Sequence, residues 1–183
     1  MRNAADYAEP LTKKGGNGED SARRVLFVCT GNTCRSPMAA ALLNHLSVRH
    51  KGSSAYTEDS NGQPRYIATS AGLYAAEGDP ITPLAANALC EAGVVDTPSN
   101  PYKTHRAHRV SEADVAAADV IVAITASHAM ELMLRFPDAA SRICTLPMDI
   151  ADPFGGSAED YRTCLAQLRF CLQSAFLSQE ETP

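Results

Sequence analysis

The chain of 183 residues contains no tryptophan, and only 6% of its residues are aromatic. It also has no apolar run that approaches the roughly 20 residues needed to span a membrane. Its first twenty residues, MRNAADYAEPLTKKGGNGED, are polar and lack the apolar stretch of a secretory signal peptide. These absences predict a protein without membrane-spanning segments and with a cytoplasmic location.

The chain also lacks a strong excess of charge of one sign. The chain has 16 basic and 21 acidic residues, which give a formal net charge of −5. So mild a charge predicts neither a nucleic-acid partner nor an anionic membrane surface. A hydrophobic content of 45% with 20% charged residues is typical of a globular protein. The length fits one domain with a substantial core. We expect a monomer or a weak dimer.

Six cysteines could indicate a disulfide framework in a chain of this size. However, Cys29 and Cys34 belong to the loop motif described below. The others, Cys90, Cys144, Cys164 and Cys171, fall in segments with apolar periodicity. Reduced thiols in a cytoplasmic protein therefore fit the pattern better.

Predicted strands and helices alternate along the chain. Strands are predicted at 24–29, 65–70, 119–124 and 143–146, and helices at 38–46, 82–93, 127–136 and from 157 onward. Such alternation indicates an α/β fold, with a parallel sheet covered by helices and a ligand site at the carboxyl ends of the strands. Residues 1–22 lack periodicity and are expected to be a disordered extension, and 51–64 to be a long loop.

Four helix termini carry recognisable signals. Ser111 and Ser157 are each followed three residues later by an aspartate, which predicts a capping box. Thr82 and the following proline are typical of a helix start, and Gly93 of the position just past a helix end.

The most informative stretch is CTGNTCRSP at 29–37, between the apolar run VLFV and a segment with helical periodicity. This context predicts a strand, a short loop and a helix start. A helix N-terminus carries unpaired N–H groups and partial positive charge, so a loop there can bind an anion. Gly31 is expected to let the loop turn tightly and Asn32 to tolerate left-handed dihedral angles. Pro37 suits the first helical turn.

A thiol and a cation stand at the two ends of this loop. Cys29 would face N–H donors, a helix N-terminus and Arg35, so we expect it to be held largely as the thiolate at neutral pH. Such a thiolate is placed for in-line attack on phosphorus, while Arg35 binds two equatorial oxygens. Cys-x5-Arg is the protein phosphatase signature, although a pattern this short also arises by chance. The longer string in its strand–loop–helix context favours phosphoryl transfer.

That longer string resembles the low-molecular-weight protein tyrosine phosphatase family. The resemblance covers residues 25 to about 177. It implies a single three-layer domain, 23–180, with a four-stranded parallel sheet, the phosphate-binding loop after the first strand and a cysteinyl-phosphate intermediate. It also implies that Asp152, in Asp-Pro-Phe, protonates the leaving group and then activates water. From the residues alone, Asp-Pro is also a common turn, and Asp149 is a competitor.

The resemblance assigns further residues to phosphate binding and loop support: Thr30, Gly31, Asn32, Thr33, Cys34, Ser36, Ser70 and His105. Ser36 is additionally expected to donate to the thiolate. By themselves, Ser70 is also consistent with an ordinary strand end and His105 with a surface histidine. The other histidines share no ligand spacing, so we expect no metal and no cofactor.

Two positions depart from the tyrosine-phosphatase pattern and resemble the bacterial protein arginine phosphatase branch. Thr33 stands where a branched aliphatic residue is usual, and Phe154 is followed by Gly-Gly-Ser instead of a second aromatic residue. A hydroxyl at Thr33 narrows the pocket wall, and Phe154 can stack on a planar guanidinium. These two residues are the expected substrate pocket. We expect phosphoarginine in proteins as substrate, with phosphotyrosine as the alternative.

Two other classes are weighed. Arsenate reductases share the fold and the loop but need two further cysteines, and after Cys34 only Cys90 lies near the expected region. A non-enzymatic module that binds anions or senses redox state is the other possibility, because Cys29 and Cys34 could form a disulfide that shields the thiolate. We interpret such a disulfide as regulation of an enzyme.

Overall fold

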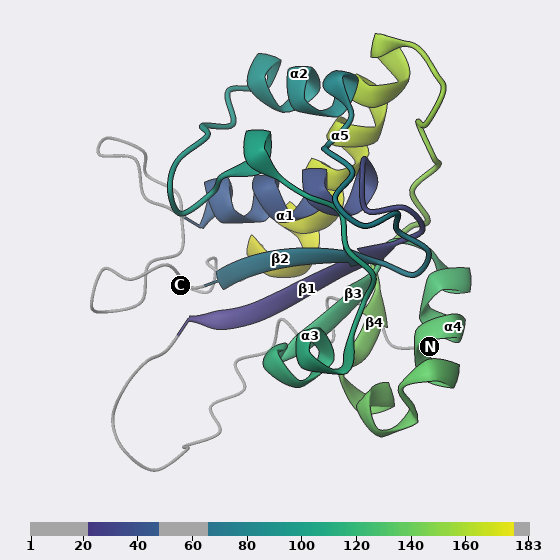
Figure 1. The fold of residues 1–183 in the computed structure, drawn as a ribbon. Coiled ribbons are helices and arrows are strands. Elements are labelled where there is room, and N and C mark those ends of the chain that lie inside the picture. The colour runs from purple at the N-terminus through teal and green to yellow at the C-terminus, as the bar shows by residue number, and fades with distance from the viewer. Residues whose placement is uncertain (1–21, 48–65, 178–183) are drawn as a thin grey trace, which may run out of the picture.

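The computed structural model describes residues 22–47 and 66–177. Its centre is a four-stranded parallel sheet in the order β2-β1-β3-β4, as Figure 1 shows. The strands are β1 (Arg23–Cys29), β2 (Tyr66–Gly72), β3 (Val120–Ala123) and β4 (Ile143–Thr145). The predicted four-stranded parallel sheet is therefore confirmed.

Helices cover both faces of this sheet, which confirms the three-layer α/β fold (Figure 1). The α-helices are α1 (Arg35–Leu46), α2 (Pro83–Glu91), α3 (Glu112–Ala117), α4 (Ala126–Arg135) and α5 (Ala158–Leu172). Shorter turns are η2 (Tyr102–Thr104), η3 (Pro137–Arg142) and a π-helical turn, η4 (Gln173–Leu177). Helices α1, α2 and α5 lie on one side of the sheet, and α3 and α4 on the other.

The two faces of β1 explain why its sequence is apolar without alternation. Val25 and Phe27 belong to the core beneath α1 and α5, while Leu26 and Val28 belong to the core beneath α3 and α4. All four are at most 1% exposed, as expected for a parallel strand buried on both faces. The strand that precedes the motif is thus held firmly from both sides.

One helix boundary differs from the sequence prediction because motif residues interrupt the apolar periodicity there. Helix α1 begins at Arg35, three residues before the predicted start, because its first turn consists of motif residues instead of apolar ones. Pro137 ends α4 as predicted but also begins η3. Both predicted capping boxes, at Ser111 and Ser157, are confirmed.

The residues predicted to mark the two ends of α2 are Thr82 and Gly93. Gly93 has φ = +77°, which confirms its place just past the helix end. Thr82 occupies the N-cap position, but its side chain makes no capping hydrogen bond. Its hydroxyl instead lies 3.4 Å from the Cys34 sulfur. The predicted helix start at Thr82 is therefore confirmed, while its hydroxyl makes a tertiary contact instead of a capping bond.

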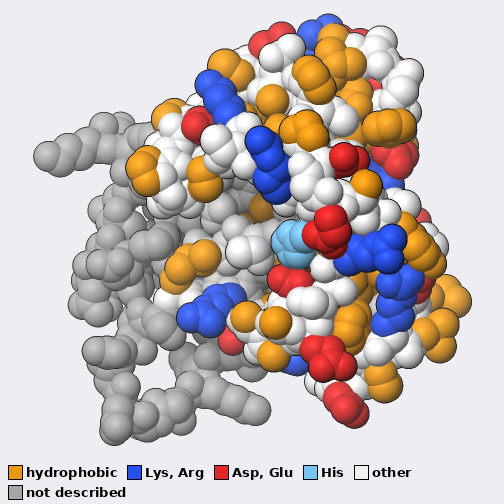
Figure 2. Space-filling model, in the orientation of Figure 1, with side chains coloured by type: hydrophobic (Ala, Val, Ile, Leu, Met, Phe, Trp, Pro, Cys, Tyr) orange, Lys and Arg blue, Asp and Glu red, His pale blue; other side chains and the backbone are white. Residues whose placement is uncertain are grey.

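Two sequence predictions fall outside the described residues: the loop at 51–64 and, apart from residue 22, the extension at 1–22. Among the described helices, none has the length and apolarity that crossing a membrane requires. Figure 2 shows acidic and basic side chains interspersed over the visible face, with hydrophobic groups between them.

Candidate active site

The motif lies at the carboxyl ends of the strands, where the loop 30–34 joins β1 to α1. The chain continues from β1 to β2 on one side and later returns to β3 on the other side. Ligands of open α/β sheets bind where the strand order reverses in this way. Because all strand pairs are parallel, the segments that follow β2, β3 and β4 begin at this same edge.

Asn32 fixes the conformation of the loop. It is fully buried and has φ = +57°, the only left-handed residue other than glycine in the described chain. Its Nδ2 donates to Ser36 Oγ at 3.0 Å and to Ser70 Oγ at 2.9 Å. Its Oδ1 accepts from the His108 backbone N–H at 3.1 Å. Asn32 thus fastens the loop to both α1 and β2.

The expectation for Gly31 is corrected by the structure. Gly31 has no positive φ, and a Cβ on it would meet nothing nearer than Thr33 Oγ1 at 3.8 Å. The tight approach occurs instead at Gly72, where a Cβ would lie 2.8 Å from the Thr30 carbonyl oxygen and 3.0 Å from the Asn32 Cβ. The end of β2 therefore supports the loop from below.

Cys29 ends β1 and is 2% exposed. Its sulfur lies 3.0 Å from Ser36 Oγ, which in turn can donate to the Ala71 carbonyl at 3.3 Å. A serine hydroxyl at this distance can donate to a thiolate and stabilise its charge. The serine comes from the first turn of α1, whose dipole points its positive end toward the loop.

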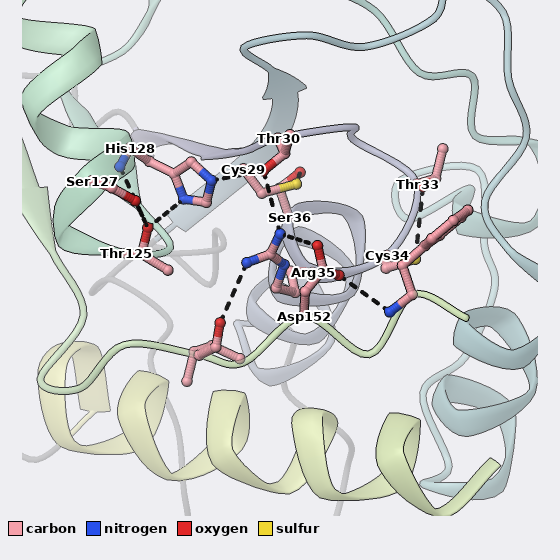
Figure 3. A network of polar contacts seen from close by, with 12 residues as sticks. Cys29, Thr30, Thr33, Cys34, Arg35, Ser36, Thr125, Ser127, His128 and Asp152 are labelled. Atoms are coloured by element: carbon pink, nitrogen blue, oxygen red, sulfur yellow. Dashed lines mark hydrogen bonds and ion pairs between the residues drawn. The ribbon is translucent and has the colours of Figure 1, made fainter. Parts of the chain in front are cut away.

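Arg35 extends beneath the loop with only 6% exposure (Figure 3). Its Nη2 donates to Asp152 Oδ2 at 2.5 Å and to Thr30 Oγ1 at 3.4 Å. Its Nη1 donates to the Ile150 carbonyl oxygen at 3.4 Å. The guanidinium is therefore held by the loop on one side and by the segment after β4 on the other.

Asp152 and its competitor have separate places. The Asp152 side chain is 49% exposed and lines the cavity above Cys29. Its Oδ1 accepts from the Phe154 backbone N–H at 3.2 Å, and Phe154 itself is 70% exposed at the cavity rim. Asp149 instead accepts from the Ala126 backbone N–H at 2.9 Å, at the start of α4.

His105 supports the loop backbone from η2. Its Nε2–H donates to the Asn32 carbonyl oxygen at 2.8 Å. Burial lowers the pKa of His105 and outweighs the opposing effect of this hydrogen bond, so the ring is neutral at neutral pH. Ser70 and His105 thus both contact the loop through Asn32, one at its side chain and the other at its backbone.

Cys34 has a hydrogen-bonded environment that sequence reasoning missed. Its sulfur lies 3.4 Å from both Thr82 Oγ1 and Tyr161 Oη, and 3.6 Å from Thr33 Oγ1. Burial, with the contact to Cys34, raises the pKa of Tyr161 to about 12, so its hydroxyl stays protonated. All six cysteines are free thiols in the structure.

His128 was also missed. It lies in the first turn of α4, 98 residues from the loop, with its Nε2 2.9 Å from Thr30 Oγ1 and its Nδ1 2.8 Å from Thr125 Oγ1 (Figure 3). Sequence reasoning considered it only as a metal ligand. A threonine and a histidine three residues apart, directly after a buried strand, are the signal that could have identified it.

A cavity of about 540 Å³ opens above Cys29 and Arg35. Apolar contributions to its wall come from Tyr74, Pro80, Ile81 and Phe154, and carboxylates from Asp79 and Asp152. Among the described residues, no three His, Cys, Asp or Glu side chains gather as a metal site would require. The arrangement joins a buried thiol, a helix N-terminus, a guanidinium and an exposed carboxylic acid, and so suits nucleophilic attack on an oxyanion of phosphate size.

Comparisons with known proteins agree with this geometry. The family model described as low molecular weight phosphotyrosine protein phosphatase matches residues 24–179. A protein-arginine-phosphatase of Geobacillus stearothermophilus is 36% identical over 152 residues, which are 79% of this chain and 88% of that protein. The low molecular weight protein-tyrosine-phosphatase PtpB of Staphylococcus haemolyticus is 32% identical over 155 residues, covering 81% and 94% of the two chains.

Among solved structures, a YwlE arginine phosphatase is similar at a TM-score of 0.68, with 30% identity. The alignment covers 82% of this chain and 91% of that one. That structure is a variant in which serine replaces a cysteine, and its active-site serine is phosphorylated.

Proposed function

The chain belongs to the low molecular weight phosphotyrosine protein phosphatase family and is a cysteine-dependent protein phosphatase; we propose that Cys29 is its nucleophile and that it hydrolyses phosphoarginine in proteins. The observation that carries the assignment of Cys29 is that its sulfur lies 3.0 Å from Ser36 Oγ while Arg35 and Asp152 line the same cavity as Cys29.

In the first step the Cys29 thiolate attacks phosphorus, forming the S–P bond while the P–N bond to the arginine side chain breaks. Arg35 and the N–H groups at the start of α1 bind the equatorial oxygens, whose charge grows in the transition state. Asp152, protonated, gives its proton to the departing nitrogen, because an unprotonated guanidine nitrogen is a poor leaving group. Arginine leaves, and a cysteinyl-phosphate remains.

In the second step a water attacks the cysteinyl-phosphate. The Asp152 carboxylate takes a proton from this water, so the same group acts first as acid and then as base. The P–S bond breaks, inorganic phosphate leaves and the Cys29 thiolate is regenerated. The Ser36 hydroxyl, 3.0 Å from the sulfur, stabilises the thiolate as leaving group.

The ion pair between Arg35 and Asp152 has to separate in this cycle. A phosphoryl dianion is a better partner for the guanidinium than one carboxylate, because it offers two oxygens for bidentate binding. Asp152 is half exposed, so it can turn toward the leaving atom without disturbing the core. Substrate binding would thus release the acid at the moment when it is needed.

The choice of phosphoarginine rests on the polar groups of the cavity wall. A phosphorylated guanidine brings several N–H donors, and Asp79 and Asp152 supply carboxylate acceptors along the lining. Thr33 adds a hydroxyl at the loop. The similarity to the arginine phosphatase of G. stearothermophilus points in the same direction.

Phosphotyrosine is the second candidate. Tyr74 and Phe154 lie at the cavity rim and could contact the two faces of a phenyl ring. The similarity to PtpB of S. haemolyticus favours this substrate.

Matched peptides that carry phosphoarginine or phosphotyrosine test the choice. We expect the wild type to have the higher kcat/KM for phosphoarginine, and Thr33→Ile to shift the ratio toward phosphotyrosine. Thr33→Val is the matched control, because it removes the hydroxyl but keeps the volume. If phosphotyrosine is the better substrate of the wild type, the arginine assignment is wrong. If neither Thr33 variant changes the ratio, Thr33 does not determine specificity.

A further inference from the structure

A buried histidine outside the loop contacts the network that holds Arg35. We propose that His128 is a positioning residue that orients the Arg35 guanidinium through the hydroxyl of Thr30. This inference rests on the proposed role of Arg35 in binding the phosphoryl group. The two residues belong to different elements, α4 and α1, and Thr30 lies between them (Figure 3).

His128 is itself held in place. It is 7% exposed, and it lies in the first turn of α4, whose N-cap is Thr125. The Thr125 hydroxyl oxygen accepts from the His128 backbone N–H at 3.4 Å and contacts the ring Nδ1 at 2.8 Å. Ser127 Oγ lies 2.9 Å from the same hydroxyl and can accept its hydrogen. The ring therefore has one orientation, fixed by the helix start.

One arrangement of the protons runs through the network in a single direction. A guanidinium only donates, so Thr30 Oγ1 accepts from Arg35 Nη2, and in this arrangement Thr30 donates its own hydrogen to His128 Nε2. Nε2 is then an acceptor, and the proton of the neutral ring resides on Nδ1 and is donated to Thr125. Each hydroxyl in the chain accepts from one side and donates to the other.

The charges around the ring favour this neutral form. Burial lowers the pKa of His128, and the positive charge of Arg35 lowers it further. Three carboxylates oppose these effects: Asp152 and Asp149 from the segment after β4, and Glu131 from α4 itself. The net pKa lies below the ordinary 6.5, so the ring is neutral at neutral pH.

Protonation would reverse the network. With a hydrogen on Nε2, Thr30 Oγ1 would have to accept from both His128 and Arg35, and its own hydrogen would turn away. A second cation would also face Arg35 inside the protein, where the repulsion is poorly screened. The positioning is therefore present at neutral pH and is lost as the pH falls through the lowered pKa of His128.

The link matters most once substrate binds. When a phosphoryl group takes the place of Asp152 as partner of Arg35, the Thr30 contact remains to align the guanidinium with the equatorial oxygens. A fork-shaped donor needs this alignment to bind two oxygens at once. Loss of a partner that orients a metal ligand typically costs about 10–100-fold in affinity or activity, and we expect a loss of the same order for a partner that orients Arg35.

Two near-isosteric substitutions separate the contact made by Nε2 from the contact made by Nδ1. His128→Gln places an amide oxygen near the position of Nε2, where it can accept from Thr30. His128→Asn places its amide near Nδ1, where it can keep only the Thr125 contact. We expect His128→Asn to lose about 10–100-fold in kcat/KM, with a parallel weakening of inhibition by vanadate. His128→Gln should stay within about threefold of the wild type, because it keeps the hydrogen bond to Thr30.

The pH profile supplies a readout that a purely structural role would not change. The ratio of kcat/KM between wild type and His128→Gln is measured on para-nitrophenyl phosphate, so that titration of the substrate cancels. We expect this ratio to decrease as the pH is lowered below 6.5, because only the wild type carries the titrating ring. A ratio that stays flat, or equal losses in the Asn and Gln variants, would overturn the proposal.

Thr30 provides a route that does not depend on the folding of the His128 variants, because Thr30 is exposed at the loop. Thr30→Val should lose activity like His128→Asn, Thr30→Ser should keep it, and the double variant Thr30→Val/His128→Asn should be no worse than either single one. Additive losses would contradict the relay. A wild type inactive on every phosphorylated substrate would instead contradict the proposed function, so the two failures are distinguishable.

Discussion

Replacing Gly72 by alanine should displace the loop without replacing any residue proposed for catalysis. The added Cβ would lie 2.8 Å from the Thr30 carbonyl oxygen, which is 0.6 Å short of the 3.4 Å of ordinary contact. It would also lie 3.0 Å from the Cβ atoms of Ala75 and Asn32. Two of these three obstacles belong to the phosphate-binding loop, so relief of the clash must displace that loop.

The cost follows from what is displaced. The Thr30 carbonyl accepts a hydrogen bond from the Tyr74 backbone N–H at 2.9 Å, and this bond would stretch or break. Forced insertion of one methyl group into a packed site costs about 1–3 kcal/mol of unfolding free energy. For a chain of this size, each kcal/mol corresponds to a fall in Tm of roughly 2–4 °C. A misplacement of the loop by most of an ångström could cost up to about 10²-fold in activity.

Gly31→Ala is the matched control for stability. Its Cβ would meet nothing nearer than Thr33 Oγ1 at 3.8 Å, and its φ is not positive. This variant should melt at or slightly above the wild-type temperature, because alanine lowers the entropy of the unfolded chain. Thermal melting followed by circular dichroism measures both variants, and phosphatase assays on Gly72→Ala follow. If Gly72→Ala melts like the wild type and keeps full activity, the proposed support of the loop by β2 is wrong.

Three further predictions follow from named contacts. Asp152→Asn should lower kcat by about 10²–10⁴-fold, since the amide cannot supply the proton, and steady-state kinetics on a phosphorylated peptide would show it; an unchanged kcat would assign the acid elsewhere. Ser36→Ala removes the hydroxyl 3.0 Å from the Cys29 sulfur, and we expect slower alkylation of the thiol by iodoacetamide at neutral pH, whereas an unchanged rate would mean that the hydroxyl does not stabilise the thiolate. Ser157→Ala breaks the capping box of α5 and should cost about 1 kcal/mol of unfolding free energy without loss of activity per folded molecule, as urea denaturation with parallel assays would measure.

Sequence reasoning located the loop well because its chemistry is local. Cys29 and Arg35 are six residues apart, and the strand and helix that flank them have their own periodic signals. The same holds for the capping boxes at Ser111 and Ser157, whose partners lie three residues away. Interactions between residues of one element or one loop can be predicted from a short stretch of sequence.

The contacts that sequence reasoning missed are tertiary. His128 reaches Thr30 across 98 residues, and Tyr161 reaches Cys34 across 127. No periodicity or spacing encodes such a pairing, because it depends on the order in which the strands lie in the sheet. The misassigned role of Gly31 has the same origin, since the close approach falls on Gly72. The contact of the Thr82 hydroxyl with Cys34 is likewise tertiary.

The most direct test of the account is to trap the cysteinyl-phosphate. The wild-type enzyme is mixed with a phosphoarginine peptide, quenched in acid within its first turnovers, digested and examined by mass spectrometry. We predict the added mass of one phosphoryl group on the peptide that contains Cys29, no such mass on any other cysteine, and neither adduct nor phosphate release with Cys29→Ala under the same conditions. Full activity of Cys29→Ala, or a phosphoryl group on a different residue of the wild type, would contradict the central claim.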